Sequence, residues 1–200
     1  MNVHPQVNTD SCAIVCMFNQ YKETPKMTAK TRRHHFFKTP DAVSATAHLT
    51  ATPMSGDQQL ALTATQAVAA MKAGTLTATA YVTTLIARAR SVAKLNAMIS
   101  LDEAGALVAA KQIDADRAAG KTMGALAGLP IVVKDNINSK AMKTTAGTSS
   151  LKGFHPVTNA PSLQKPLDAG AILLGKSNLH EFAFGVTTTN FTLGLDPSQI

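Results

Sequence analysis

A lysine followed by an aspartate and an asparagine stands directly after a short β-branched run in residues 129–137. The run Ile131-Val132-Val133 favours a buried strand. Lys134 would then lie at the carboxyl end of that strand, where the loops of α/β sheets gather and ligands bind. Burial there disfavours the charged form of an ammonium group, which can make it a general base. Lys134 is therefore the candidate catalytic residue; a solvated Lys-Asp loop is the alternative that this pattern leaves open.

Residues 144–150 form a segment rich in hydroxyl groups and glycine, just downstream of Lys134. Such a segment could supply backbone N–H groups and hydroxyls to the wall of an active site, or it could be an ordinary turn. His180-Glu181 resembles the start of a zinc-protease motif, but Phe184 occupies the place of its second histidine, which excludes that motif. No nucleotide-binding glycine motif is present either. We expect no metal and no cofactor.

The elements that must position these residues follow from periodicity and capping signals. Apolar spacing predicts helices over residues 63–74, 79–95 and 102–119, and a further helix over 159–169 that contains an unfavourable Pro166. Short apolar runs predict strands at 97–101, 131–133 and 171–174. A strand, a helix and a second strand after three helices indicate an α/β sheet preceded by helices.

Composition restricts the class of protein. The chain has 200 residues, 45% of them hydrophobic and 16% charged, and no apolar run approaches the roughly 18–20 residues of a membrane span. The net charge of +7 comes from scattered basic residues rather than a stripe, which argues against nucleic-acid binding.

The two ends of the chain differ in pattern. Residues 1–55 lack periodicity, so we expect an irregular, disordered N-terminal extension with a natural start near Met54, followed by one domain over 56–200. The only cysteines, Cys12 and Cys16, lie in that extension; they are weak evidence for a metal or a disulfide. A domain without cysteine fits a reducing cytoplasm.

Four segments in order, residues 124–137, 144–148, 159–161 and 169–190, closely resemble the amidase signature family. The resemblance extends over about residues 60–200. It implies a partial amidase-signature fold: N-terminal helices followed by the first strands of a mixed twisted sheet. It also implies hydrolysis of a small-molecule amide by a Ser-Ser-Lys triad whose lysine is Lys134, with a homodimer as the arrangement considered.

The family's glycine- and serine-rich segment, which carries both serines, does not occur among the 200 residues. Ser198 lacks flanking glycines and is given no catalytic role, so we expect these 200 residues alone to be inactive. Three departures from the family's pattern are Ala125 for proline, Thr148 for serine, and Pro166 within a helix.

Substrate preference is suggested by His180, because the glutamyl-tRNA amidotransferase A-type subunit usually carries an aspartate there. The segment looks closer to indoleacetamide and mandelamide hydrolases. The alternatives are a non-enzymatic truncated remnant and the amidotransferase subunit.

Overall fold

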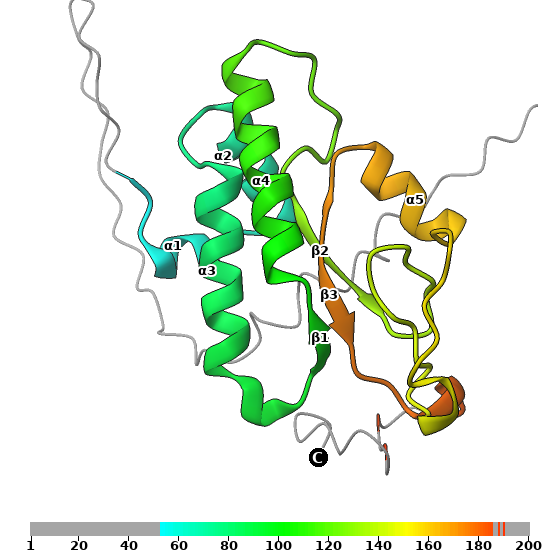
Figure 1. The fold of residues 1–200 in the computed structure, drawn as a ribbon. Helices are drawn as coiled ribbons and strands as arrows, with labels where there is room; N and C mark the ends of the chain where they lie inside the picture. Colours follow the sequence, from blue (N-terminus) through cyan, green and yellow to red (C-terminus); the bar gives the residue numbers. More distant parts are fainter. Residues whose placement is uncertain (1–52, 186–187, 189, 191–200) are drawn as a thin grey trace, which may run out of the picture.

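The computed structural model describes residues 53–185, 188 and 190. The expected extension up to residue 52, including both cysteines, lies outside the described residues. Along the described chain the elements are α1 (Gly56–Leu60), α2 (Ala64–Lys72), α3 (Ala78–Ser91), η3 (Ala93–Leu95), β1 (Met98–Leu101), α4 (Glu103–Ala118), β2 (Pro130–Lys134), η4 (Ser149–Leu151), α5 (Pro161–Asp168), β3 (Ile172–Ser177) and η5 (Glu181–Ala183) (Figure 1).

The three strands form one mixed sheet in the order β1-β3-β2. The central strand β3 pairs antiparallel with β1 and parallel with β2, and each pairing contains a register shift. The α/β class and the mixed sheet inferred from the sequence are therefore confirmed. β3 runs three residues further than expected, through Gly175, Lys176 and Ser177.

Helices cover both faces of this sheet. Figure 1 shows α1 to α4 on one side of the sheet, and α5 with the long connection after β2 on the other. The core on the α2–α4 side contains Met71, Tyr81 and Val82 together with Val132 of β2. The core on the α5 side contains Val133, Leu163, Leu173 and Met142. Successive residues of β2 therefore pack into opposite cores, as the alternation of a strand requires.

Side-chain caps fix where the helices begin. Thr63 and Gln66 make the reciprocal capping box predicted for α2, and Asp102 accepts the N–H of Gly105 at the start of α4. Ser55 and Gln58 make a second capping box that opens α1, a short helix that the periodicity analysis missed. The helix predicted over 79–95 ends four residues early, at Ser91, and a 3-10 turn completes the span.

Pro166 lies inside α5 and does not abolish it. The helix begins at Pro161, whose ring suits the first helical position, and ends two residues after Pro166. The missing N–H of Pro166 deprives only the carbonyl of Ser162, an exposed residue that water can reach. The cost of this proline is therefore smaller than in the middle of a long helix.

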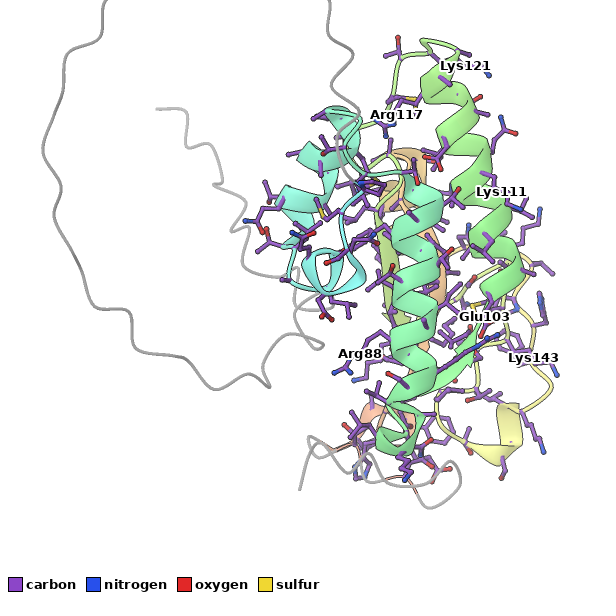
Figure 2. All side chains as sticks on the ribbon, turned by 90° about the vertical axis from the view of Figure 1, so that its left-hand side faces the viewer. Arg88, Glu103, Lys111, Arg117, Lys121 and Lys143 are labelled. Atoms are coloured by element: carbon purple, nitrogen blue, oxygen red, sulfur yellow. The ribbon has the colours of Figure 1, made fainter. Side chains whose placement is uncertain are left out.

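Among the described helices, none is both long enough and apolar enough to cross a membrane. Basic side chains are spread over several elements, with Arg88 on α3, Lys111 and Lys121 on α4 or just after it, and Lys143 in the connection after β2 (Figure 2). This spread agrees with the scattered charge seen in the sequence.

Candidate active-site segment around Lys134 and Lys176

Lys134 is the last residue of β2 and pairs in register with Ser177 of β3. Its backbone carbonyl accepts the N–H of Ile137, which closes a turn directly after the strand. The side chain is half-buried, and within the described residues its amine makes no hydrogen bond or ion pair. Because side chains alternate along a strand, Lys134 lies on the same face of the sheet as Val132, which belongs to the core on the α2–α4 side.

Asp135 follows Lys134 and points to the other side of the sheet, where its side chain is 1% exposed. One carboxylate oxygen, Oδ2, accepts the N–H of Thr145 at 3.0 Å and also the hydroxyl of the same threonine. The backbone carbonyl of Asp135 accepts the N–H of Ala146 at 3.0 Å. Asp135 therefore ties the turn after β2 to the hydroxyl-rich segment.

The fully buried amine of this region belongs to Lys176, in the central strand. Its Nζ donates to the carbonyl of Ile137 and to the hydroxyl of Thr144 at 3.0 Å, and it lies 3.7 Å from Oδ1 of Asp135. Burial lowers the pKa of Lys176, and the charge of Asp135 offsets part of that effect.

The sequence analysis expected a partly desolvated amine at Lys134 and did not expect a second, fully buried amine at Lys176. Lys134 is half-buried and Lys176 is 0% exposed. A signal for the buried residue was available: Gly175 and Lys176 directly continue the apolar run from Ala171, so a longer strand would carry a lysine inside the sheet.

The hydroxyl-rich segment lies against this cluster and is held from two sides. Thr144 and Thr148 are buried, and Thr148 caps the 3-10 turn η4. The side-chain amide of Asn190 donates to the carbonyl of Gly147 at 2.8 Å and to the carbonyl of Leu179 at 3.0 Å. Gly147 has a φ of +68°, and a Cβ there would lie 2.4 Å from Asn190 Nδ2, so only glycine fits.

Residues 180–185 form a tight turn beside that segment. The N–H of Phe182 donates to the carbonyl of Ala146 at 2.8 Å, and both Phe182 and Ala183 have positive φ. The imidazole of His180 lies over Gly185, where an added Cβ would meet Nδ1 at 2.1 Å. Nδ1 is buried without a hydrogen-bond partner among the described residues. Around His180 and Glu181, as elsewhere in the described residues, no group of three or more His, Cys, Asp or Glu side chains is placed to hold a metal ion.

Together these contacts place the end of β2, the hydroxyl-rich segment and the 180–185 turn at the same end of the sheet. This end, where the parallel strands β2 and β3 have their carboxyl ends, is where α/β proteins bind small molecules. The candidate base is half-buried, and the hydroxyl-rich segment is hydrogen-bonded to Asp135, the residue that follows Lys134. The described residues contain no hydroxyl nucleophile paired with either lysine apart from Thr144 on Lys176.

Comparison with known proteins gives this arrangement a family. The family model described as Amidase matches residues 80–195. Among similar curated proteins, the A-type subunit of the glutamyl-tRNA(Gln) amidotransferase from Lachnospira eligens is 40% identical over 66% of this chain and 28% of that protein. The human mitochondrial counterpart is 39% identical over 63% of this chain and 24% of that protein. The chain thus spans about a quarter of the length of these relatives.

A solved structure agrees with the family match. The native peptide amidase from Stenotrophomonas maltophilia is 36% identical, with a TM-score of 0.56, over 60% of this chain and 25% of that protein. The strand-end lysine, the hydroxyl-rich segment and the 180–185 turn all fall within the matched residues 80–195. On this match, which takes in more than half of its residues, the chain belongs to the amidase signature family, a family of amide-hydrolysing enzymes.

Proposed function

We propose that the protein carrying this chain hydrolyses a small carboxamide to a carboxylate and ammonia, with Lys134 as the base of a Ser-Ser-Lys triad. The observation that carries the proposal is the position of Lys134 at the carboxyl end of β2, half-buried and free of any partner among the described residues. An amine in an ion pair is held in its protonated form, so it would have to break that pair and lose its proton before it could act as a base. Lys134 has none to break.

In the proposed reaction, neutral Lys134 accepts a proton from a bridging serine, which accepts one from the nucleophilic serine. The oxygen of the nucleophilic serine bonds to the amide carbon. The C–N bond breaks, and the relayed proton goes to the departing nitrogen, which leaves as ammonia. Water then cleaves the acyl-enzyme ester to release the carboxylate. Both serines lie in a segment that is not among these 200 residues, so the 200 residues alone are proposed to be inactive.

The test compares the full-length protein with its Lys134→Met variant in the release of ammonia from phenylacetamide and mandelamide. Loss of a general base costs about 10²–10⁴-fold in rate, so the kcat of the variant should fall at least about a hundredfold. Lys111→Met, which changes an exposed lysine on α4, is the matched control and should leave kcat unchanged (Figure 2). Equal turnover by the Lys134→Met variant would refute the assignment.

A second candidate, within the same amide chemistry, is the A-type subunit of a glutamyl-tRNA amidotransferase. The observation favouring it is the identity of about 40% to curated proteins of that name. The observation favouring a free-standing hydrolase is His180, whose ring lies against Gly185 in place of a shorter acidic side chain. Co-purification with partner proteins, and glutaminase activity that depends on them, would select the amidotransferase.

A third alternative, a non-enzymatic remnant, concerns the gene product rather than the fold. If the reading frame after codon 200 encodes a glycine- and serine-rich segment, the enzyme proposal stands for the gene. A stop codon at that position would favour the remnant.

The absence of cysteine from residues 56–200 supports a reducing compartment, which we propose is the cytoplasm.

A further inference from the structure

Lys176 joins the central strand to two segments that lie 32 to 41 positions earlier in the chain. From the central strand β3, its Nζ reaches the carbonyl of Ile137 and Asp135 Oδ1 in the turn after β2. It also reaches the hydroxyl of Thr144, which opens the hydroxyl-rich segment. No other described lysine is fully buried.

β3 and the turn after β2 are also in contact with the backbone of Lys134. Lys134 pairs with Ser177, the residue next to Lys176, and the N–H of Asp135 donates to the carbonyl of Ser177 at 3.2 Å. The N–H of Ile137 donates to the carbonyl of Lys134 at 2.9 Å. The turn that follows the candidate base is thus attached to β3 by its backbone at Asp135 and by the Lys176 side chain at Ile137.

The contacts suit an ammonium group rather than an apolar side chain. An ammonium has three N–H donors, and Lys176 faces three acceptors: a carbonyl, a hydroxyl and a carboxylate oxygen. Oδ1 of Asp135 has no hydrogen-bond partner, so the ion pair with Lys176 is its only compensation within the described residues. An apolar residue would leave these acceptors buried and unpaired.

We propose that Lys176 is a positioning residue for Lys134. It clamps the 135–137 turn and Thr144 to the central strand, and so fixes the end of β2 relative to the hydroxyl-rich wall. The clamp concerns only how firmly the 135–137 turn is held to the central strand. Its effect on catalysis rests on the proposed function of Lys134.

The clamp is tested by amide hydrogen exchange on the 200-residue chain. The double variant Lys176→Met/Asp135→Asn removes both charges, so no lone charge is left buried; Lys111→Met is the control. Protection of the Ile137 and Ala146 amides should fall at least tenfold, while the Ile86 amide in α3 stays within twofold of wild type. Unchanged protection at Ile137 and Ala146, or an equal fall at all three amides, overturns the proposal.

A milder variant decides the matter if the double variant does not fold. Thr144→Val deletes one acceptor of the ammonium group, together with the long 3.4 Å hydrogen bond from the Thr144 hydroxyl to the Ile137 carbonyl, and leaves both charges in place. Protection at Ile137 should then fall at least threefold with the Ile86 amide unchanged. No change at Ile137 overturns the clamp.

The catalytic consequence is tested in the full-length protein by separating kcat from KM. The double variant should unfold at a higher temperature than Lys176→Met alone, because no charge is left unpaired, yet its kcat should stay at least tenfold below wild type with KM within threefold. A kcat that recovers together with the melting temperature would make Lys176 merely structural and overturn the proposal. If wild type releases no ammonia, the proposed function fails, and the exchange experiment still judges the clamp.

Discussion

Two lysines on neighbouring strands meet opposite environments at the edge of this sheet. Lys134 and Lys176 are one register position apart, since Lys134 pairs with Ser177 and Val133 pairs with Lys176. Strand alternation directs Lys134 toward the α2–α4 side of the sheet and Lys176 toward the α5 side. The Lys134 side chain is half-buried and has no described partner, whereas Nζ of Lys176 faces three acceptors.

This contrast predicts unequal effects on stability. Lys134→Met should change the free energy of unfolding by no more than about 0.5 kcal/mol, because no described partner is lost. Lys176→Met should cost about 3–5 kcal/mol, because it leaves the Asp135 carboxylate buried without its counter-charge. Urea denaturation of the 200-residue chain measures both values. Similar losses for the two variants would contradict the environments described for them.

The lowered pKa of Lys176 predicts a dependence of stability on pH. Between that lowered pKa and the ordinary lysine value, the unfolded chain binds more protons than the folded chain, so the free energy of unfolding should rise with pH. Tyr81, whose pKa burial raises above 10.0, acts in the opposite direction above that pH. The rise should therefore be sought below pH 10. It should vanish in the Lys176→Met/Asp135→Asn variant and persist in Lys111→Met; a rise that persists in the double variant would assign it to another group.

At the scale of the element, the hydroxyl-rich segment depends on a single backbone position. Gly147→Ala would force a Cβ to within 2.4 Å of Asn190 Nδ2 at a positive φ, and should destabilise the chain by about 1–3 kcal/mol. Gly153→Ala is the matched control, since its Cβ would meet no atom within 4 Å. It should be neutral or slightly stabilising. Equal unfolding midpoints in urea for the two variants would mean that Asn190 does not hold the segment.

The sequence predicted the elements whose signals are local. The capping box at Thr63, the β-branched run before Lys134 and the glycine after α5 each depend on residues a few positions apart, and each element is present. The burial of Lys176 depends on Asp135, Ile137 and Thr144, which are 32 to 41 positions away. No periodicity reports such contacts, and the catalytic role of Lys134 stays a proposal.

At the scale of the whole molecule, the sheet has β1 and β2 as its outer strands, and no strand covers their outer edges in the described part of the chain. Uncovered edges promote association between chains. Ile99→Lys places a charge on β1 outside both cores and should reduce association of the 200-residue chain. Val108→Lys, at a helical position that is 69% exposed, is the control and should not. Sedimentation velocity across a concentration series measures this; equal association in both variants would exclude the β1 edge.

The central strand β3, which pairs with both β1 and β2, is also the last of the three strands to be translated. β1 and β2 share no pairing with each other and must each wait for β3, whose final residue comes 43 positions after Lys134. At about 5–20 residues per second, a ribosome needs about 2–9 s to add that stretch. Throughout this interval the nascent chain holds two unpaired strands and an aspartate whose counter-ion has not yet been synthesised.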